Sequence, residues 1–559
     1  MTTEEKIQLW KKCASDDLLR EMQSLSPEEL KERFESDLTF GTAGLRGKMG
    51  VGTNRLNVYT VRKYTLALAH LAAAHNATGI AVCYDTRLHS KTFAEETAKV
   101  LTAAGLKVFL AGEPMPTPVL SFAVRHLRCY AGVMITASHN PKEYNGYKVY
   151  QADGGQITEA IADDVQGIAS RLDAFDIPTL SLEEAAKQNL VHYFDQHFLD
   201  AYFANVEAQE FRRLQNVKIV YTPLNGTGAR FVPQALKQQG VRYLHVVKEQ
   251  SAPDGTFPTC PKPNPETEEA LALGVQALQE LHYDVLLATD PDCDRVGVVV
   301  MTERGPVHLS GNDVGVLLLN YILTSLKEQK MLPPNPLVVK TIVSSDLATR
   351  IAQKYGAHVK NVLTGFKYIG EAIGKAERLG GIEQFVFGFE ESCGYLSGTY
   401  VRDKDAVNAC TLIAEMTEYY LSQGKTLLNV LGDLFLEFGY YQSKQLSFQF
   451  EGAAGKRRMA KFMDEMRYGE YPTLCGQPVL CRVDYLSDDT HLPKENMLLF
   501  ELPQGRVILR PSGTEPKLKI YLAYGYKNMR EISILDELSA FFTQAVQKSS
   551  SNNEGAAQN

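Results

Sequence analysis

The chain has 559 residues, of which 44% are hydrophobic and 22% charged, and its formal net charge is -8 at pH 7. At a soft ~150 residues per domain, this length corresponds to three or four domains that can each bury a core. The acidic balance argues against a general nucleic-acid-binding protein, while a local cationic pocket for an anionic metabolite stays possible.

Export and membrane signals are not recognisable in the sequence. The first residues, Met1-Thr-Thr-Glu-Glu-Lys, contain no apolar signal core, and no run of ~18 apolar residues occurs. The nine cysteines are scattered without a Cys-x-x-Cys pair, which disfavours a disulfide framework and a structural zinc site. We therefore expect a cytoplasmic protein with neither membrane nor nucleic-acid partners, and its oligomeric state is left open.

The first unit, residues 1–210, begins with about 38 charged, helix-prone residues, in which Ser26-Pro-Glu-Glu predicts a helix start. A glycine-rich segment, Phe40–Lys48, follows, and its glycines would let backbone N–H groups approach an anion. Its spacing is not that of a Walker loop. The alternative is a glycine-rich turn with a solvated Arg46.

Helical and apolar strand patterns then alternate along the first unit. Strands are expected at residues 80–84, 106–110 and 131–135, with helices between them. This repetition predicts a mainly parallel sheet with helices on both of its faces.

Two further units have the same texture. The second, residues 211–320, opens with a strand at 217–221, and the third, residues 321–440, with one at 336–343. Because the strands ending at Asp85-Thr-Arg87, Thr222-Pro-Leu-Asn-Gly and Ser344-Ser-Asp open comparable α/β stretches, we expect a loose threefold repeat.

From about residue 441 short strands accompany only two helices. We expect a smaller α+β domain over residues 441–548, with a turn at Pro503-Gln-Gly505, and a disordered tail over 549–559. The expected fold class is therefore α/β: three α/β domains of similar topology with mixed, mainly parallel sheets, followed by a C-terminal α+β domain.

The first candidate site follows the strand at 131–135. Ser138 stands where this strand ends, in Ser-His-Asn-Pro turn chemistry, and ligands in open α/β sheets bind beyond such strand ends. Asn145-Gly146 predicts a tight hairpin turn that would aim Lys148 back toward Ser138 and His139. A hydroxyl, an imidazole and an ammonium group would then lie together at one small opening beyond the end of the strand. The alternative is an ordinary surface loop.

The sharpest pattern is Asp290-Pro-Asp292-Cys-Asp294-Arg295, between two apolar runs. Carboxylates at alternate positions can gather round one hard cation when the loop curls. An EF-hand loop needs glycine at its sixth position, where this chain has Arg295, and the spacing does not fit a dehalogenase-type aspartyl nucleophile either. Arg295 could grip phosphate beside the metal. A solvated acidic loop is the alternative.

Two more motifs carry groups suited to a sugar phosphate. In Gly388-Phe-Glu-Glu-Ser, Glu390 and Ser392 could hydrogen-bond vicinal hydroxyls, and Lys404 nearby is available for an anion. Arg510-Pro-Ser-Gly-Thr-Glu-Pro-Lys517 combines cations, hydroxyls and a glycine turn, as a phosphate cradle does. Tight turns without a ligand are the alternative for both.

The four motifs occur in the order found in the α-D-phosphohexomutase family, which the chain resembles over nearly its whole length. They are Thr136-Ala-Ser-His-Asn-Pro, Asp290-Pro-Asp-Cys-Asp-Arg, Gly388-Phe-Glu-Glu-Ser and Arg510-Pro-Ser-Gly-Thr-Glu-Pro. The segment from Phe40 to Gly47 looks most like the branch that holds bacterial phosphoglucomutases and phosphopentomutase-type enzymes. The resemblance implies four domains round a central cleft.

The resemblance also implies an activity, the interconversion of glucose 1-phosphate and glucose 6-phosphate through a phosphoserine enzyme and a bisphosphorylated sugar. Mg²⁺ and glucose 1,6-bisphosphate, as activator and intermediate, are implied with it. Pentose or mannose phosphates remain possible substrates of the same mechanism. A metal-dependent sugar phosphatase that uses an aspartate and a non-catalytic sugar-phosphate sensor are the alternatives from other classes.

Residue roles follow from the same resemblance. Ser138 would be the phosphorylated residue, its phosphoryl oxygen completing the metal site of Asp290, Asp292 and Asp294. Groups assisting proton transfer would be His139 and Lys148, and those beside the transferring phosphoryl group Arg46 and Arg295. The sugar hydroxyls would be held by Glu390 and Ser392, with Thr364 and Lys404 near them. The non-reacting phosphate would be held by Arg510, Ser512, Gly513, Thr514 and Lys517.

Overall fold

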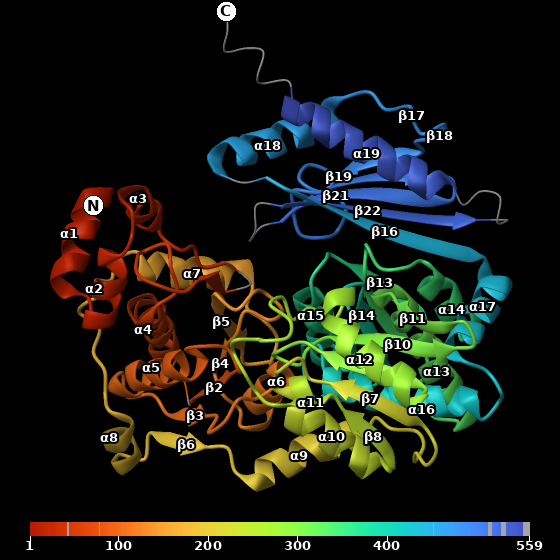
Figure 1. Cartoon of the computed structure of the whole chain (residues 1–559), viewed down its shortest axis with the longest axis horizontal. Helices are drawn as coiled ribbons and strands as arrows, with labels where there is room; N and C mark the ends of the chain where they lie inside the picture. Colours follow the sequence, from red (N-terminus) through yellow and green to blue (C-terminus); the bar gives the residue numbers. More distant parts are fainter. Residues whose placement is uncertain are drawn as a thin grey trace, which may run out of the picture.

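The chain forms four units in a computed structural model that describes residues 1–41, 44–75, 77, 79–450, 452–512, 517–526 and 533–551. Figure 1 shows the first three units together and the fourth, in blue, above the third. The predicted cradle residues Gly513 and Thr514 lie outside the described residues, as does 552–559 of the expected tail.

Three short helices cap the N-terminal end of the first unit. They are α1 (Thr3–Cys13), α2 (Asp16–Gln23) and α3 (Pro27–Glu35). The predicted helix start is confirmed, because Ser26 caps α3 in a reciprocal pair with Glu29. Trp10 makes edge-to-face contacts with Phe34 and Tyr59, which gives this cap a small core of its own.

One arrangement of four strands occurs three times. In each, the first strand pairs in parallel with the second and third, and the fourth runs antiparallel to the third. The first copy is β2 (Ile80–Tyr84), β3 (Val108–Leu110), β4 (Ala131–Ile135) and β5 (Tyr144–Gln151). The second is β7 (Lys218–Thr222), β8 (Tyr243–Val246), β9 (Val285–Thr289) and β10 (Val296–Thr302). The third is β12 (Leu337–Thr341), β13 (His358–Val362), β14 (Phe385–Glu390) and β15 (Gly394–Leu396).

Additional edge strands extend two of these sheets. β1 (Leu45–Lys48) and β6 (Val191–Tyr193) flank the first, and β11 (Gly305–Leu309) flanks the second. Every residue of β2, β4 and β9 is buried, which explains their unbroken apolar sequences. The predicted α/β class and the threefold repeat are confirmed.

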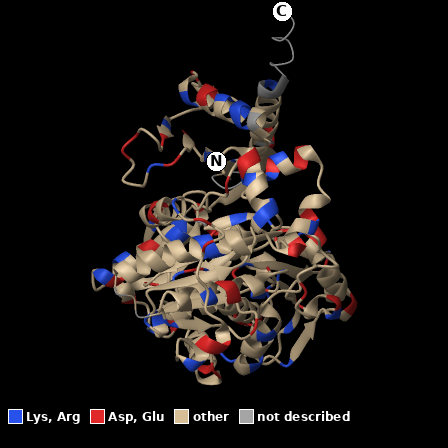
Figure 2. Ribbon diagram, turned by 90° about the vertical axis from the view of Figure 1, so that its left-hand side faces the viewer, with Lys and Arg blue, Asp and Glu red and all other residues tan. Residues whose placement is uncertain are grey.

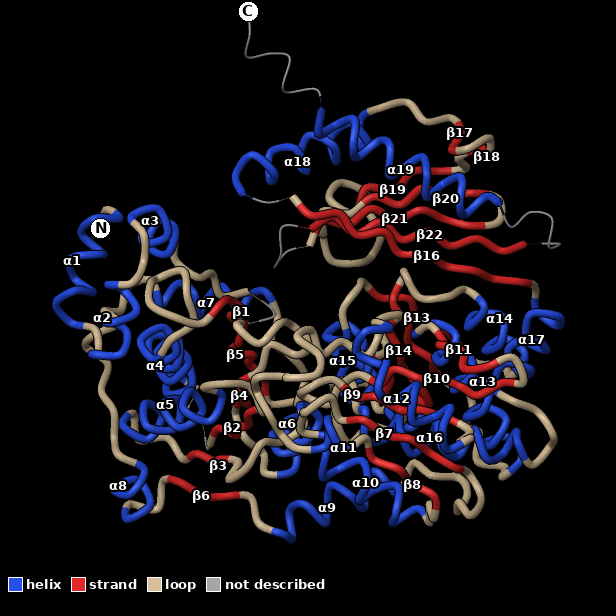
Figure 3. Tube along the Cα trace, in the orientation of Figure 1, coloured by secondary structure: helices blue, strands red, loops and turns tan. Residues whose placement is uncertain are grey.

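Helices connect the strands and pack against the sheets (Figure 3). The first unit has α4 (Val58–Ala74), α5 (Ser90–Ala103), α6 (Thr117–His126), α7 (Glu159–Ala169), α8 (Leu182–Lys187) and α9 (Gln196–Glu207). The second has α10 (Gly228–Gln239), α11 (Lys248–Ser251) and α12 (Glu268–Leu281). The third has α13 (Gly311–Glu328), α14 (Leu347–Lys354), α15 (Phe366–Arg378), a 3₁₀ turn (Ile382–Gln384), α16 (Ala406–Leu421) and α17 (Leu427–Phe438).

The fourth unit is an antiparallel sheet carrying two helices. Its strands, in spatial order, are β16 (Tyr440–Gln449), β22 (Lys517–Tyr526), β21 (Gly505–Pro511), β20 (Leu498–Leu502) and β19 (Cys481–Asp484). A separate two-stranded ribbon pairs β17 (Thr473–Leu474) with β18 (Gln477–Pro478), and the helices are α18 (Gly452–Tyr468) and α19 (Ser533–Ser551). The predicted turn between β20 and β21 is confirmed, and α19 continues to Ser551, past the expected start of the tail.

Alternate side chains of these strands show which face of the sheet contacts the third unit. Val507 and Leu509 belong to the cluster that includes the α18 and α19 side chains, whereas Ile508 between them packs with Ile342 and Val343 of the third unit. Successive strand residues point to opposite faces. One face of the sheet therefore holds its own helices, and the other rests on the third unit.

The predicted hairpin turn at Asn145-Gly146 is wrong, because both residues lie inside β5. The connection between β4 and β5 is instead residues 136–143, so Ser138 itself stands in it. Asn145 is buried and donates to the Leu88 carbonyl, 3.0 Å away. The sequence pair fits a turn, but the close approach of neighbouring backbone explains the glycine instead.

The glycine-rich segment also differs from expectation. Residues Leu45–Lys48 form the edge strand β1, antiparallel to β5, so Arg46 extends from a strand and not from a turn. Gly44 has φ +72°, and a side chain there would overlap the Tyr147 carbonyl. The glycine therefore permits a backbone crossing that no other residue would tolerate.

Charged positions of both signs are interspersed over the view in Figure 2, without one single-sign band. Among the described helices, none has the length and apolar character needed to cross a bilayer.

We predict that Gly146→Ala destabilises the first unit. An added Cβ would clash with the Thr136 carbonyl oxygen and lie 2.9 Å from that of Leu45, with backbone on both sides. Overpacking of this kind costs about 1–3 kcal/mol. Thermal denaturation should show a lower Tm. Gly167→Ala is the control: it lies inside α7 with nothing within 4 Å, and should raise the Tm slightly. Equal shifts in the two variants would contradict the crowding at Gly146.

Candidate active site

The predicted groups of the first three units occupy the same point of the repeat. The connection between the third and fourth strands carries Ser138 in the first unit and the three aspartates in the second. In the third unit it starts after Glu390, the last residue of β14, and contains Ser392. Hydrogen bonds link the three: Ser138 donates to Asp290, and the N–H of Val296, the first residue of β10, donates to the Cys393 carbonyl over 3.1 Å.

Each of these connections holds one residue in the left-handed backbone region. They are Ser138 at φ +53°, Cys293 at φ +52° and Cys393 at φ +60°. For a residue with a Cβ this conformation is disfavoured by ~1–2 kcal/mol, so surrounding contacts must maintain it. None of the three is a glycine, so the sequence contains no signal of these sharp turns.

Ser138 points its hydroxyl at the aspartate loop. Its Oγ donates to Asp290 Oδ2 over 2.9 Å and lies 3.1 Å from His139 Nδ1. The serine is only 3% exposed. Burial, together with the charges of Arg295 and Arg46, lowers the pKa of His139 well below its ordinary value, so the imidazole is neutral at pH 7.

The three aspartates form a buried carboxylate cluster. Asp290, Asp292 and Asp294 each offer an oxygen, and these atoms all lie within 4.8 Å of one another. Burial and the other two carboxylates raise the pKa of Asp290 well above its usual range. Burial also raises the pKa of Asp294, whereas the Lys148 ammonium lowers that of Asp292 against the effect of burial.

Two oxygen atoms of the cluster, Asp292 Oδ1 and Asp294 Oδ1, are buried without a hydrogen-bond partner, and Arg295 Nε lies 3.8 Å from the second. Buried carboxylate oxygens left unpaired are costly, and a hard divalent cation prefers such oxygens as ligands. The donor set therefore fits a divalent metal held by Asp290, Asp292 and Asp294, as the sequence predicted.

Two lysines from different units hold the cluster in place. Lys148 Nζ lies 3.0 Å from Asp292 Oδ2 and 4.0 Å from Asp294 Oδ2. Lys404 Nζ lies 3.3 Å from Asp294 Oδ2, 3.1 Å from Asp403 Oδ1 and 3.8 Å from Glu390 Oε1. Lys404 thus links the aspartate loop to the predicted sugar-binding loop, a contact that no sequence pattern indicated.

Neighbours that sequence reasoning did not identify complete this region. Thr117, at the start of α6, donates its hydroxyl to Asp292 Oδ2 over 3.0 Å and its N–H to the Asp292 carbonyl over 2.8 Å. Glu266 Oε1 lies 3.2 Å from Arg295 Nη1. Their only sequence signals were a proline-rich helix start and an isolated acid, which are too common to be informative.

The predicted sugar-binding residues lie on the third unit. Glu390 is 4% exposed, and Thr364, just after β13, is 8% exposed with its hydroxyl oxygen buried and unpartnered. Ser392 is half-buried in the connection after β14. Unpartnered buried hydroxyls are rare without a ligand or water, so Thr364 is suited to a sugar hydroxyl.

The predicted cradle lies on the fourth unit. Arg510 is the penultimate residue of β21, with its Nε 2.6 Å from Glu495 Oε1, and the Ser512 N–H donates to the Lys517 carbonyl over 2.8 Å. Lys519, which pairs with Arg510 across β21 and β22, was not predicted. Its charge lowers the pKa of His139 in the first unit, a lesser effect than that of burial. Lys519 therefore acts electrostatically on the serine loop.

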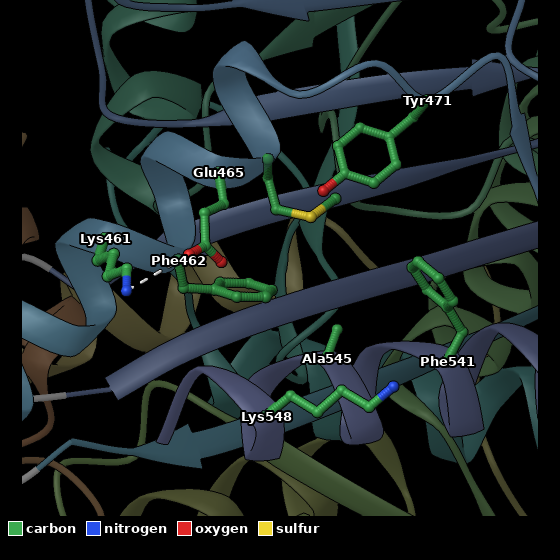
Figure 4. A pocket seen from close by; sticks show the side chains of 8 residues that line it. Lys461, Phe462, Glu465, Tyr471, Phe541, Ala545 and Lys548 are labelled. Atoms are coloured by element: carbon green, nitrogen blue, oxygen red, sulfur yellow. Dashed lines mark ion pairs between the residues drawn. The ribbon is translucent and has the colours of Figure 1, made fainter. Parts of the chain in front are cut away.

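A separate cavity of about 200 Å³ lies in the fourth unit, between α18 and α19 (Figure 4). It is lined by Lys461, Phe462, Glu465, Met466, Tyr471, Phe541, Ala545 and Lys548. None of the predicted site residues lines it, and the ion pair between Lys461 and Glu465, 3.9 Å long, stays within α18. The chemistry lies at the joined connections instead.

Four protein-family models match successive parts of the chain. Their descriptions are phosphoglucomutase/phosphomannomutase alpha/beta/alpha domain I for residues 37–175, domain II for 196–305, domain III for 310–438, and the C-terminal domain for 488–523. The third match begins at the start of α13, which runs unbroken through residue 320. The expected unit boundaries stay predictions.

Individual proteins show the same similarity. A phosphoglucomutase from Staphylococcus haemolyticus is 37% identical over 543 residues, which cover 94% of this chain and 97% of that protein. Among solved structures, a putative phosphomannomutase from Thermus thermophilus has a TM-score of 0.69 at 22% identity, covering 91% of this chain and 99% of its own. An Aspergillus fumigatus N-acetylphosphoglucosamine mutase, in complex with GlcNAc-6P and magnesium, has a TM-score of 0.51 at 14% identity, covering 96% and 100%.

We predict that a divalent cation raises the Tm and that Asp290→Asn removes this gain. A ligand at 100 times its dissociation constant stabilises the fold that binds it by about 2.7 kcal/mol. The amide keeps a hydrogen-bond acceptor but loses the charge that attracts the ion. Thermal shift with Mg²⁺ or Mn²⁺ measures this. The control is Asp433→Asn, an exposed carboxylate on α17 paired with Lys425. An undiminished gain in Asp290→Asn would exclude the cluster as the metal site.

Proposed function

The chain belongs to the phosphoglucomutase/phosphomannomutase family, and we propose that it interconverts glucose 1-phosphate and glucose 6-phosphate through a phosphorylated Ser138. It is an isomerase of the phosphohexomutase class. The observation that carries the catalytic proposal is the 2.9 Å contact between the Ser138 hydroxyl and Asp290, which joins the nucleophile loop to the carboxylate cluster. Phosphoryl transfer needs this positioning and charge neutralisation above all.

The proposed cycle transfers a phosphoryl group twice. Phospho-Ser138 first gives its phosphoryl group to the free hydroxyl of the sugar monophosphate, so that the Oγ–P bond breaks and a sugar O–P bond forms. The bisphosphate then reorients, and its other phosphoryl group returns to Ser138. A divalent cation at the three aspartates would neutralise charge on the phosphoryl oxygens. We assign Mg²⁺ and a glucose 1,6-bisphosphate activator on the strength of the family and of the buried, unpartnered oxygens.

Proton handling is assigned to groups beside the serine. His139 is neutral and 3.1 Å from Ser138 Oγ, while Lys148 is paired with Asp292. We propose that both residues assist transfer of the proton that the sugar hydroxyl releases, and such help is worth ~10²–10⁴-fold. Arg46 and Arg295 act on the charge of the transferring group, because both already act electrostatically on His139.

Substrate contacts come from the third and fourth units. We propose that Glu390, Ser392, Thr364 and Lys404 meet the sugar hydroxyls. The proposed ligands of the non-reacting phosphate are Arg510, Ser512, Gly513, Thr514 and Lys517. Glu495 fixes the guanidinium of Arg510 by its 2.6 Å contact with Nε.

The phosphatase alternative fits the geometry less well. Asp290 Oδ1 accepts the N–H groups of Asp294 and Arg295 at 3.1 and 3.0 Å, and Oδ2 accepts the Ser138 hydroxyl. Both oxygens of Asp290 are thus engaged, and the Staphylococcus relative is a phosphoglucomutase, so we favour Ser138 over Asp290 as the phosphoryl carrier. Pentose and mannose phosphates are less favoured than glucose phosphates, because the Staphylococcus relative is a phosphoglucomutase.

A cytoplasmic location is also proposed. All nine cysteines carry free thiols, and six of them are buried within the first three units. Free thiols are typical of proteins from reducing compartments.

Ser138→Ala is expected to abolish mutase turnover without lowering the Tm. Loss of the hydroxyl removes the atom that carries the phosphoryl group. A coupled assay from glucose 1-phosphate, primed with glucose 1,6-bisphosphate, measures this. Ser539→Ala is the matched control, since Ser539 is a buried serine of α19 that donates only within its helix. Near-normal turnover by Ser138→Ala would disprove the nucleophile.

Arg510→Ala should raise the KM for glucose 1-phosphate about tenfold or more, since a charge-assisted bond to the phosphate is lost. Steady-state kinetics measures KM and kcat separately. Arg482→Ala serves as the control. This arginine lies on β19, an edge strand of the same sheet, and donates to the Gly469 carbonyl. An unchanged KM in Arg510→Ala would remove this residue from the cradle.

A further inference from the structure

Two residues just after strand β2, Asp85 and Arg87, fix the peptide groups on both sides of Ser138. On the amino side, the Ser138 N–H donates to Thr136 Oγ1 over 2.8 Å. The Thr136 hydroxyl donates in turn to Asp85 Oδ2 over 2.6 Å. The N–H of the serine is therefore oriented through Thr136 by a buried carboxylate on the neighbouring strand.

On the carboxyl side, one guanidinium collects the carbonyls of the serine loop. Arg87 Nη2 donates to the Ser138 carbonyl over 2.5 Å and also to that of Asn140. Its Nη1 donates to the carbonyls of Pro141 and Tyr144 over 2.9 and 3.1 Å. The arginine side chain is fully buried, as are its hydrogen bonds to the Ser138 and Asn140 carbonyls, whereas those to Pro141 and Tyr144 are partly buried.

Asp85 and Arg87 also fix each other. Arg87 Nε lies 3.3 Å from Asp85 Oδ2, and Asp85 Oδ1 accepts the Arg87 N–H over 2.9 Å and the Ser90 hydroxyl over 2.7 Å. The Phe257 ring of the second unit lies 5.0 Å from the guanidinium carbon. We call the pair Asp85 and Arg87 the clamp. Its arginine therefore also contacts the second unit, which supplies the aspartates.

We propose that Arg87, oriented by Asp85, is a positioning residue that keeps the Ser138 hydroxyl aimed at the aspartate cluster. A left-handed serine persists only when its surroundings over-determine it, and this pair holds the N–H on one side and the carbonyl on the other. If the clamp is released, the backbone relaxes and swings Oγ away from Asp290. This inference rests on the proposed function, which makes Ser138 the phosphoryl carrier.

The chemistry of the side chain explains why arginine is needed. Only a planar guanidinium presents enough donors in a fixed fork to meet four carbonyls at once. Lysine keeps the charge but offers a compact ammonium with rotating donors. Arg87→Lys therefore separates the geometry of the fork from its charge.

The test compares Arg87→Lys, Thr136→Val and wild type in the primed glucose 1-phosphate assay. Displacement of a reacting atom by about 1 Å costs roughly 100-fold, so Arg87→Lys should lower kcat by that factor. KM should stay within about threefold, because the substrate contacts lie on other units. Thr136→Val keeps the shape of the side chain, and we expect a decrease of about tenfold. Guanidinium ion at low millimolar concentration should partly restore kcat in Arg87→Ala.

Arg212→Ala is the matched control for loss of a structural arginine. Arg212 donates to Tyr321, Ser325 and Glu328, away from the serine loop, and the variant should lose stability while keeping kcat. If Arg87→Lys turns over normally, or KM and kcat change together, the positioning role is wrong. Should Arg87→Lys not fold, normal kcat in Thr136→Val overturns the proposal.

Crystal structures separate this inference from the proposed function. In Arg87→Lys or Thr136→Val, we expect Ser138 to leave positive φ and its Oγ to leave Asp290. An unchanged serine in both variants would overturn the clamp whatever the activity. A wild-type protein with no mutase turnover would instead overturn the proposed function.

Discussion

Three carboxylates enclosed within 4.8 Å of one another are the constraint on which the rest of the site depends. Such a cluster is repulsive, and two lysines from different units, Lys148 and Lys404, only partly offset it. Two of the carboxylate oxygens remain buried without hydrogen-bond partners. A divalent ion would resolve this imbalance, and the hydroxyl of Ser138 is already directed at the same cluster. Charged and polar groups of all three units therefore meet at this cluster, while the three units also share one apolar core.

The threefold repeat explains how distant parts of the chain reach one another. In each copy, predicted site residues lie in or next to the connection from the third to the fourth strand. Each connection turns sharply at a residue with a left-handed backbone, which is Ser138, Cys293 or Cys393. The three equivalent positions thus carry the proposed nucleophile, the carboxylate cluster and the proposed sugar contacts. The fourth unit rests on the third through one face of its sheet and carries the proposed phosphate cradle.

Much of this organisation could be predicted from the sequence, because it depends on local patterns. The apolar runs of β2, β4 and β9 predicted buried strands, and alternate aspartates predicted the cation site. The turn expected at Asn145-Gly146 was wrong, since that pair has the composition of a turn while close backbone packing determines its place in β5. Contacts between distant residues, such as Arg87 with the serine loop, leave no periodic trace in a sequence.

The roles of the individual site residues came from the resemblance to a family and not from periodicity. All of these roles depend on which residue carries the phosphoryl group. The most direct test is to treat the purified protein with glucose 1,6-bisphosphate and locate the bound phosphate by peptide mass spectrometry. The account predicts one phosphate, on the peptide that contains Ser138. Phosphate on an aspartate such as Asp290, or on no residue at all, would contradict it.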